Sequence, residues 1–467
     1  MSKVNLDLPQ VAVRERRLGS LTGYQGTAAD LVTACGGCGG KMKDAARSFS
    51  QCLGCSTSQA ACTSILINDA ALLSHGPVGC SVCLHGFNFT YFADAASHGV
   101  SEPKQRRIFS TNLTEKDAIY GGMVKLEQGI KDVYERVHPS AIFVTTTCAS
   151  GIIGDDVESV TNRVSDEIGI PVVAIFCEGF RSKIWTSGFD SGYHGIARKL
   201  IHPPREGKRE ERKIINVINF WGSDIFGEWF EHFGYKPNYL TPFTNIDDLK
   251  YASEAVATVQ ACATLGSYLG AALEQKFGVK EITTSPPYGI AQTDRWFREL
   301  GQLLGQPEVA EKLIAEKRDK YLPRIKELRE KLSGIRGYVT AGASHGHSML
   351  ALMKELGIET VGGAIFHHDP IYDNGRVESD TLAHTVNDYG DIPNLNICNK
   401  QEFELVNTLY RLKPDFLIAR HGGMTLWGAK LGIPSLLIGD EHFGMGYEGL
   451  VRYGEAILET IENDEFV

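Results

Sequence analysis

The 467-residue sequence contains no long hydrophobic run and no apolar segment at its N-terminus. Its apolar runs, such as Ala141–Val144 and Val172–Cys177, are far shorter than the ~20 residues that a membrane-spanning helix needs. The N-terminal residues, MSKVNLDLPQVAVRERRLGS, lack the apolar region of a secretory signal. These absences predict a cytoplasmic protein that does not enter a membrane.

Basic charge is also scarce in this chain. It has 47 Lys and Arg against 57 Asp and Glu, which gives a formal net charge of −10. Because general nucleic-acid binding requires clustered basic charge, the sequence predicts no nucleic-acid partner. In contrast, 43% hydrophobic and 22% charged residues are ordinary values for a folded globular protein. The length predicts about two to four domains.

Cysteine is plentiful. The sequence contains 11 cysteines, and most of them lie between Cys35 and Cys83. An odd number of cysteines in a reducing compartment favours metal binding or catalysis over a disulfide framework. The alternative is that some of them are small buried hydrophobic residues. A role as a buried hydrophobic residue is favoured for Cys398. For Cys177 this role and a functional role have equal support.

Strand and helix patterns alternate along the chain from about residue 105 onward. Buried strands such as Ala141–Thr147 and Pro171–Phe176 are followed by helices, an order that produces parallel sheets covered by helices on both faces. The predicted fold class is therefore α/β, with three doubly wound parallel-sheet domains. Polar stretches separate them and give these boundaries: a lead-in at 1–30 and domains at 31–206, 207–334 and 335–467.

Residues with reactive side chains follow several of the predicted strands. Cys148 follows AIFVTTT, whereas Ser344, His345 and His347 follow GYVTA, and His442 lies just beyond SLLIGDE. Open α/β sheets bind their ligands outside the carboxyl ends of the strands. These loops are therefore candidate site positions.

The spacing of four cysteines near the N-terminus predicts a metal site by itself. Cys35, Cys38, Cys52 and Cys55 form a C-x2-C-x13-C-x2-C array. This pattern is typical of four thiolates around a tetrahedral zinc ion. The array competes with a second set for Cys55.

That second set consists of Cys55, Cys80 and Cys148, each flanked by small residues. Thiolates from three loops of one domain could hold an iron–sulfur cluster, with backbone N–H groups near the sulfur atoms. Spacing alone leaves open that these are three unrelated buried cysteines. A downstream set combines Cys262, expected on a long helix over Ala255–Lys276, with the histidines His194, His367, His368 and His442.

Several segments together resemble a known family. Cys55, HGPVGC ending at Cys80, TTTCASGIIGDD around Cys148 and IPVVAIFCEGF resemble the component 1 subunits of nitrogenase and nitrogenase-like reductases. The segment QACATLGSYL around Cys262, the FHHD run that begins at Phe366, and LGIPSLLIGDEHFGMGYEGL are most similar to the alpha-type (D-type) subunit. The resemblance extends over most of the chain.

This resemblance implies three Rossmann-like domains and two metal clusters. An [8Fe-7S] P-cluster would be shared with a beta-type (K-type) subunit, with Cys55, Cys80 and Cys148 as the ligands in the first domain. An [8Fe-9S-C]-type active-site cofactor would be anchored by Cys262 in the second domain and a histidine in the third. The histidine nearest the ligand position is His442, and Phe366 would lie near the cofactor. An α2β2 complex would receive electrons from a transiently bound, ATP-dependent iron–sulfur reductase protein (H-type).

The pocket residues depart from the pattern of the alpha-type subunits that reduce dinitrogen. Ser344 stands where those subunits carry an arginine, and His194 is all that remains of a Gln-Ser-x-Gly-His-His segment. We therefore predict a reductase that cleaves the C–S bond of methylthio-alkanes, with His194, His367 or His368 as proton donor. The alternatives are an E-type subunit that assembles the cofactor, a dinitrogen-reducing alpha subunit, and a zinc-stabilised α/β binding protein.

Overall fold

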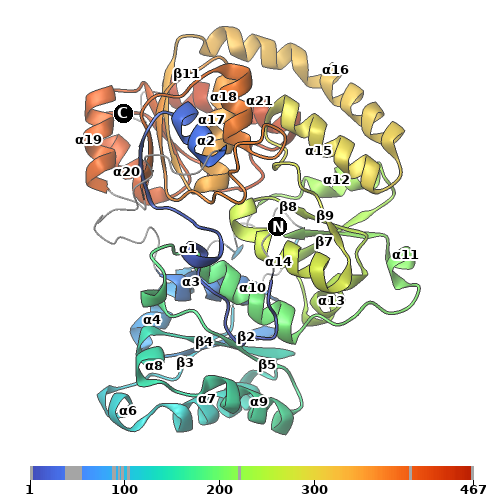
Figure 1. Ribbon diagram of the computed structural model, residues 1–467, viewed down its shortest axis with the longest axis vertical. Coiled ribbons are helices and arrows are strands. Elements are labelled where there is room, and N and C mark those ends of the chain that lie inside the picture. Colours follow the sequence, from blue (N-terminus) through green and yellow to red (C-terminus); the bar gives the residue numbers. More distant parts are fainter. Residues whose placement is uncertain are drawn as a thin grey trace.

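The computed structural model contains three α/β parts, each built around its own sheet (Figure 1). It describes residues 4–36, 55–86, 91–92, 95, 99–101, 106–218, 222–398 and 402–463. Within these ranges every ladder of the three sheets is parallel except the one formed by β1, which confirms the predicted α/β class. None of the helices that it describes is both long and apolar enough to cross a bilayer.

The first sheet lies at the lower end of the molecule in Figure 1 and has the strand order β3-β2-β4-β5. Its two central strands are buried along their whole length, as expected for parallel strands covered on both faces. The register pairs His75 with Thr146, so β2 and β4 end at the same level. The strands are β2 (Ala70–His75), β3 (Ile108–Ser110), β4 (Ala141–Thr146) and β5 (Val172–Ile175). The helices are α3 (Ser56–Ile65), α4 (Val78–Val82), η1 (Cys83–His85), α6 (Glu115–Tyr120), α7 (Met123–Val137), α8 (Cys148–Ile153), α9 (Val157–Ile168), η3 (Gly179–Arg181) and α10 (Ser187–Lys199).

The second sheet has the order β7-β6-β8-β9 and leads through a long charged helix, α16, to the third part. Lys317 on α16 is buried between Glu228 (2.8 Å) and Glu448 (3.1 Å), which holds this helix against both parts. The strands are β6 (Ile214–Ile218), β7 (Lys236–Thr241), β8 (Ala257–Gln260) and β9 (Lys280–Glu281). The helices are α11 (Lys208–Arg212), α12 (Phe226–Glu231), α13 (Ile246–Lys250), η4 (Ala252–Glu254), α14 (Ala263–Phe277), α15 (Gly289–Leu303) and α16 (Pro307–Leu332).

The third sheet has six strands in the order β1-β12-β11-β10-β13-β14. Its edge strand β1 (Gly23–Gly26) comes from the N-terminal segment and pairs antiparallel with β12, so this segment does more than lead into the first part. The other strands are β10 (Arg336–Ala341), β11 (Glu359–Ile365), β12 (Leu395–Cys398), β13 (Phe416–Ala419) and β14 (Ser435–Leu437). The helices are α1 (Arg14–Arg17), α2 (Ala28–Gly36), α17 (Ala343–Glu355), α18 (Thr381–Tyr389), α19 (Glu402–Leu412), α20 (Gly422–Lys430) and α21 (Gly446–Glu462).

The helix predicted at Ala255–Lys276 is wrong in its N-terminal part. Residues Ala257–Gln260 form strand β8, and the helix α14 begins only at Ala263. The segment contains the β-branched residues Val256, Thr258 and Val259, which favour a buried strand. Cys262 is consequently the N-cap of α14 and follows a parallel strand, the position at which α/β sheets place their ligand residues.

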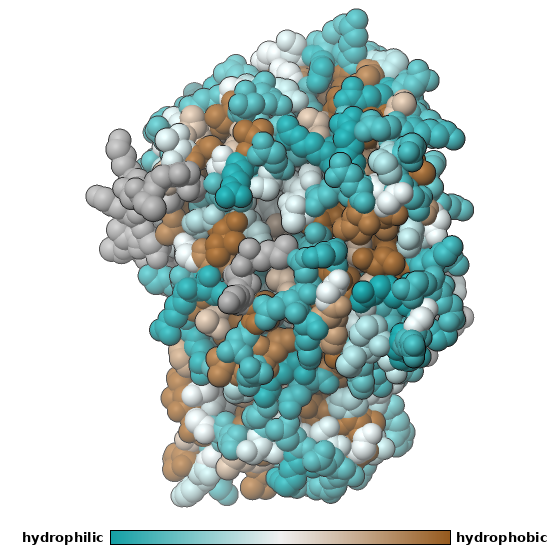
Figure 2. Space-filling model, turned by 45° about the vertical axis from the view of Figure 1, so that its right-hand side comes forward, coloured by the Kyte–Doolittle hydropathy of each residue, from teal (hydrophilic) through white to brown (hydrophobic). Residues whose placement is uncertain are grey.

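The hydrophobic core continues from one part to the next. One buried cluster contains Phe143 of β4, Leu265 of α14 and Phe366 after β11, so it joins residues of all three parts. The face of the molecule drawn in Figure 2 is mostly hydrophilic, with hydrophobic patches of limited size between the polar side chains. The three parts therefore pack as one body with a shared interior.

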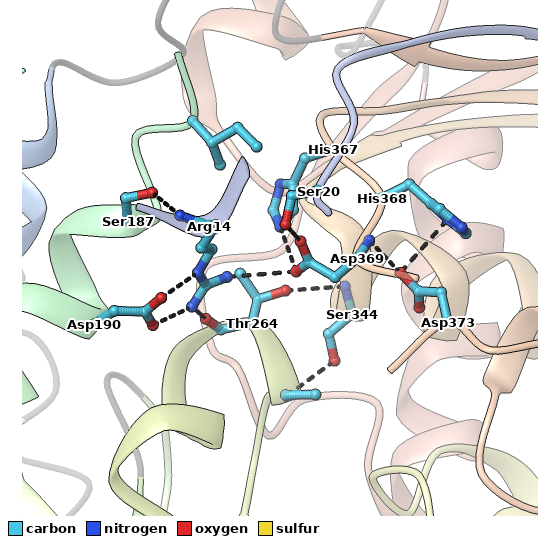
Figure 3. A network of polar contacts seen from close by, with 12 residues as sticks. Arg14, Ser20, Ser187, Asp190, Thr264, Ser344, His367, His368, Asp369 and Asp373 are labelled. Carbon is cyan, nitrogen blue, oxygen red and sulfur yellow. Dashed lines mark hydrogen bonds and ion pairs between the residues drawn. The ribbon is translucent and has the colours of Figure 1, made fainter. Parts of the chain in front are cut away.

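A single arginine from the N-terminal segment connects the three parts. The Arg14 side chain is fully buried, and its Nε and Nη2 atoms donate to the Asp190 carboxylate of α10 at 2.9 and 2.7 Å. Its Nη2 atom also donates to the carbonyl oxygen of Thr264 on α14. Its Nη1 atom lies 3.4 Å from the carboxylate of Asp369, which follows β11 (Figure 3). Arg14 thus contacts one residue from each of the three parts.

The charges in this network stabilise one another. Burial disfavours the ionised form of Asp190, but Arg14 and Arg17 outweigh it and hold the pKa of this carboxyl below its usual value. Arg17 lies 2.5 Å from the same carboxylate. The hydroxyl of Ser20 donates to Asp369, so the segment from Arg14 to Ser20 neutralises both acidic residues.

Replacement of Arg14 tests this network. The variant Arg14→Met would leave the Asp369 carboxylate without its arginine and the Asp190 carboxylate with only Arg17. We expect the free energy of unfolding to fall by about 3–5 kcal/mol, the usual cost of removing one partner from a buried ion pair. Arg16→Met is the matched control, because Arg16 is exposed in the same helix and should change stability by less than ~0.5 kcal/mol. Urea unfolding of both variants measures the difference, and equal unfolding midpoints would contradict the role of Arg14.

Candidate metal centres

The predicted cluster thiols lie on loops at the carboxyl edge of the first sheet. Cys80 lies in α4 after β2, Cys148 is the first residue of α8 after β4, and Cys55 immediately precedes α3. A Cβ atom built on Gly179, which follows β5, would lie 3.3 Å from the Cys55 sulfur and 3.5 Å from the Cys148 sulfur. The structure therefore brings the sulfur atoms of Cys55 and Cys148 next to the same residue, Gly179.

The loops that carry Cys80 and Cys148 are packed directly against each other. Thr147 donates a hydrogen bond from its Oγ1 atom to the His75 carbonyl oxygen (3.0 Å). A Cβ atom on Gly76 would lie only 2.3 Å from the same Oγ1 atom, so position 76 has no room for a side chain. Gly76, the first glycine of the HGPVGC segment, thus allows the close approach that places Cys80 beside Cys148.

Cys80 also lies close to the other thiols. Burial raises the pKa of the Cys80 thiol, and the neighbouring sulfur atoms of Cys55, Cys148 and Cys83 raise it further. Burial and Cys55 likewise raise the pKa of Cys83. Four thiols therefore interact electrostatically at this edge, although we predicted only three of them as a set.

The surface around these thiols is apolar. Val78 and Val82 on α4, Ile152 on α8 and Phe180 beside Gly179 are each more than half exposed. The thiols of Cys55, Cys80 and Cys148 are themselves only partly buried. Exposed apolar residues grouped around a polar site are typical of a surface that another protein covers.

The second candidate centre is the buried thiol of Cys262, which is 1% exposed. It lies where the carboxyl edges of the second and third sheets meet. The backbone N–H of Ala263 donates to Ser344 Oγ, and the backbone N–H of Ser344 donates to Thr264 Oγ1, each at 3.3 Å. These two bonds connect the start of α14 to the start of α17 and bring His345 next to Cys262.

His345 and Cys262 shift each other's pKa. Burial would raise the pKa of the Cys262 thiol, but His345 outweighs burial and lowers it. Burial also disfavours the imidazolium form of His345, but Cys262 and then Glu441 raise its pKa to about 9. Each partner therefore favours the charged form of the other, the thiolate of Cys262 and the imidazolium of His345.

Glu441 and Arg420 extend this chain of charges. The His345 Nε2 atom lies 3.8 Å from the Glu441 carboxylate, which accepts a hydrogen bond from Arg420 at 2.9 Å. The Tyr288 hydroxyl donates to the Glu441 carbonyl oxygen (2.6 Å) and faces His345 Nδ1 at 3.1 Å. The segment after β14 is therefore fixed beside Cys262.

A cavity of about 410 Å³ adjoins this centre. Ala263, Thr264 and Ser344 line one side, and His347 and Asp369 line another. Most of its other lining residues carry hydroxyl, amide or charged side chains, among them Gln260, Thr283, Ser285, Asp373 and Arg376. Apolar residues such as Trp296 and Ile282 complete the lining, so the cavity is mixed in polarity and extends from residues next to Cys262.

His367 and His368 are buried on the segment that follows β11. The His367 Nε2 atom lies 3.4 Å from Asp369, and its Nδ1 atom has no hydrogen-bond partner within the described part of the chain. The His368 Nδ1 atom lies 3.5 Å from the carboxylate of Asp373 (Figure 3). Burial lowers the pKa of His368 despite this neighbour. His367 therefore belongs to the Arg14 network through Asp369.

His442 and Phe366 lie on the same side of the third sheet. The His442 Nδ1 atom donates to the Ser223 carbonyl oxygen (2.5 Å), which leaves the lone pair of the imidazole on Nε2. A Cβ atom on Gly222 would be 2.7 Å from this ring, so the second part packs tightly against it. Phe366 stacks on His421 with a distance of 5.3 Å between ring centroids.

His194 has contacts of a different kind from the other predicted histidines. Its Nε2 atom donates to the Leu8 carbonyl oxygen (2.8 Å), and its Nδ1 atom faces the Tyr268 hydroxyl at 2.7 Å. Burial lowers the pKa of this imidazole. Both ring nitrogens therefore serve to join α10 to α14 and to the N-terminal segment.

Sequence reasoning missed three residues of these centres. His345 was noted only as one of several polar residues after a strand, and nothing in the sequence pairs Glu441 or Arg420 with Cys262. The zinc array falls largely outside the described residues, which exclude Cys38, Cys52 and the side chain of Cys35. Among the side chains that are described, no group of three His, Cys, Asp or Glu could hold a single metal ion.

Comparison with known proteins relates the chain to one family. Residues 55–462 match the family described as Nitrogenase component 1 type Oxidoreductase. The chain is 28% identical over 418 residues to the nitrogenase molybdenum-iron protein alpha chain of Methanothermobacter marburgensis, which covers 85% of this chain and 84% of that protein. It is 31% identical over 346 residues to the nitrogenase iron-molybdenum cofactor biosynthesis protein NifE of Clostridium pasteurianum, which covers 70% of this chain and 72% of that protein.

A solved structure shows the same fold. The structure titled nitrogenase Cp1 at pH 5 aligns with a TM-score of 0.70 at 22% identity and covers 90% of each chain. Because the similarity covers nearly the whole chain, it confirms the fold in all three parts.

The close packing of Gly76 provides a test of how the thiol loops are positioned. In Gly76→Ala the added methyl group would collide with Thr147 and force the two loops apart, and overpacking of this kind costs about 1–3 kcal/mol. Gly79→Ala is the matched control in the same loop, since a Cβ atom there has no neighbour within 4 Å. Thermal unfolding of the metal-free chain should show a lower midpoint for Gly76→Ala alone. An equal loss in both variants would mean that the contact with Thr147 is not the constraint.

Proposed function

Because the chain belongs to the nitrogenase component 1 type oxidoreductase family, we propose that it is the catalytic alpha-type subunit of a nitrogenase-like reductase. Its reaction would be the reductive cleavage of a C–S bond in methylthio-alkanes. The observation that carries the proposal is the buried Cys262 thiol beside His345, which lies where the carboxyl edges of the sheets converge and next to a cavity with many polar side chains.

The residues around Cys262 fit a buried metal cofactor. A thiolate is a strong ligand for iron, and His345 lowers the pKa of the Cys262 thiol despite complete burial. His442 donates its Nδ1–H to a backbone carbonyl, the usual arrangement of a metal-ligating histidine that coordinates through Nε2. Cys262 and His442 would therefore hold the [8Fe-9S-C]-type cofactor, which supplies electrons at low potential when bound.

The thiols of the first part fit the second cluster. Cys55, Cys80 and Cys148 would contribute this chain's ligands to a P-cluster shared with a beta-type subunit. The exposed apolar residues beside them, Val78, Val82, Ile152 and Phe180, support a partner that covers this face. The ATP-dependent reductase protein would dock on the same complex, which we propose to be an α2β2 assembly in the cytoplasm.

The proposed division of labour follows the three parts of the chain. Residues 31–206 would bind the shared cluster, 207–334 would supply Cys262, and 335–467 would supply His442. The Arg14 network supports this division because it fixes the three parts relative to each other at the proposed cofactor site.

The reaction needs two electrons and two protons for each C–S bond. One electron pair breaks the bond, one proton goes to the departing carbon to give a hydrocarbon, and the other goes to sulfur to give a thiol. His367 is the best placed proton donor, because it is buried, its Nδ1 atom has no hydrogen-bond partner among the described residues, and Asp369 orients its Nε2 side. His368 stands beside it, whereas both nitrogens of His194 are engaged with Tyr268 and Leu8.

A cofactor-assembly scaffold is the second candidate. The similarity to NifE from Clostridium pasteurianum favours it, since that relative is named for cofactor biosynthesis. A scaffold would bind the cofactor through the same residues and release it to another protein. The two functions are separated by turnover: the scaffold would carry the cofactor but form no thiol when the reductase protein and ATP are added.

Anaerobic purification with the beta-type partner tests the proposed function. We expect more than about eight iron atoms per heterodimer, and release of methanethiol from a methylthio-alkane with the reductase protein and ATP. Cys262→Ala should remove about half of the iron and all turnover, because it removes the cofactor anchor but not the shared cluster. Cys398→Ala, a buried cysteine of β12, is the control that should keep both. Iron content that is unchanged in Cys262→Ala would contradict the assignment.

A further inference from the structure

A buried histidine that the proposed function does not use, His347, lines the cavity beside Cys262. It lies on α17, three residues after Ser344, and residues three apart share one face of a helix. Ser344 in turn is bonded to Ala263, the residue that follows Cys262. The start of α17 therefore presents Ser344 and His347 to the same cavity.

One carboxylate fixes the orientation of the His347 ring. The Nδ1 atom of His347 lies 3.2 Å from Oδ1 of Asp373. The other oxygen of Asp373 accepts a hydrogen bond from the backbone N–H of Asp369 at 2.9 Å, which holds the carboxylate in place. Gly346 allows α17 to lie close to β11, because a Cβ atom there would collide with Ile365. His347 is therefore held against the segment that follows β11.

The second ring nitrogen of His347 is left for the contents of the cavity. Among the described residues Nε2 has no hydrogen-bond partner, although the side chain is only 1% exposed. A buried polar atom without a partner is costly, so its presence calls for a ligand. A histidine whose Nδ1 faces a carboxylate while its Nε2 is kept for the substrate has the arrangement of a general acid or base.

The charges around His347 favour its protonated form. Burial lowers the pKa of this imidazole, but Asp373 outweighs burial, with Asp380 and Asp369 adding to the effect, so the pKa lies above its usual value. His368 faces the same Asp373 carboxylate at 3.5 Å, but burial lowers its pKa, so it opposes the imidazolium only weakly. His347 can therefore hold a proton that it releases to a basic group in the cavity.

The remaining lining of the cavity suits a small thiol. Apolar surface for an alkyl group comes from Ile282, Pro286 and Trp296. Burial raises the pKa of Glu281 and of Tyr372, so both favour their uncharged forms. Arg376 also lines the cavity and is exposed, so the cavity reaches the surface. His347 is thus the buried acid in a cavity that solvent can enter.

We propose that His347 donates the proton that converts the departing sulfur into a thiol, within the cavity beside Cys262. This inference rests on the proposed function, which needs one proton at carbon and one at sulfur. The bonding pair and the two electrons supplied through the cofactor end as one pair on carbon and one pair on sulfur. His367 serves the carbon, whereas the Nε2–H bond of His347 breaks as the S–H bond forms.

The transfer to sulfur is favourable and can be repeated. An alkyl thiolate is a stronger base than an ordinary imidazole, so the proton moves from nitrogen to sulfur. The His347 imidazolium becomes neutral in this step, and solvent that enters the cavity restores its proton. The apolar lining residues leave the neutral thiol free to depart by the same opening.

The experiment uses the anaerobically purified complex with the beta-type subunit, a saturating amount of the reductase protein, ATP and a methylthio-alkane. In His347→Gln we expect the kcat for thiol release to fall by about 100-fold or more, because glutamine cannot act as a proton donor, while KM changes little. The iron content should stay that of the unmodified complex. His384→Gln is the matched control, because its Nδ1 atom also lies 3.2 Å from a carboxylate, that of Asp388, but His384 does not line the cavity.

Three readouts distinguish proton donation from a structural role. Thiol release should decline as the pH rises through the pKa of His347, and in Asp373→Asn this decline should move to lower pH, because the carboxylate no longer favours the imidazolium. NMR titration of the histidine side chains in the metal-free chain should show the same shift for the signal that is missing in His347→Gln. Imidazole added to His347→Ala should restore thiol release, because it can enter the cavity and carry the proton.

The outcomes separate this inference from the proposed function. If His347→Gln releases thiol as fast as the unmodified complex, or if His347 titrates below the usual histidine range, the inference is overturned and the proposed function stands. If His347→Gln loses iron together with activity, His347 holds the site together and is not the donor. If the unmodified complex carries iron but releases no thiol, the proposed function fails and the inference fails with it.

Discussion

The buried guanidinium of Arg14 is the interaction on which the arrangement of this protein depends. It forms ion pairs with Asp190 and Asp369 and a hydrogen bond with Thr264, and these residues come from three different parts of the chain. A charge buried this deeply is stable only when its partners are held in fixed positions, so the network requires the three parts to take one relative orientation. That orientation brings the carboxyl edges of the sheets to face each other, with Cys262, His345 and Glu441 between them.

Close backbone packing positions the thiols at the edge of the first sheet, just as charged contacts position the residues around Cys262. Gly76 allows the Cys80 loop to contact Thr147, and Gly179 allows Cys55 and Cys148 to meet. Each of these contacts would be lost if a Cβ atom were present. The glycine-rich sequence around the cysteines thus has a local cause, because thiols from separate loops can converge only where the backbones approach one another.

The sequence was sufficient to predict the α/β class and most strands, whereas a common site for Cys55 and Cys148 was implied only by the family resemblance, because spacing alone left three unrelated buried cysteines open. It was not sufficient for the partners of Cys262. His345 and Glu441 follow two strands of a different sheet. Only tertiary packing determines how close these residues lie to the Cys262 thiol. The strand β8 was taken for helix because its apolar residues continue into α14, and a short apolar run has no clear period. The role of Arg14 was hidden for a related reason, since a basic cluster near a terminus is ordinarily solvated.

The two groups of thiols proposed to bind metal differ in their electrostatic surroundings. At Cys262 the imidazolium of His345 lowers the pKa of the fully buried thiol and so favours its ionised form. At the edge of the first sheet, burial and the neighbouring thiols raise the pKa of Cys80 and Cys83 instead. A cation bound between the thiols would favour their ionised form, and iron is the cation that the proposed function places there. The Cys262 thiol, by contrast, already has a cationic neighbour in His345, with which the proposed cofactor would compete for the sulfur.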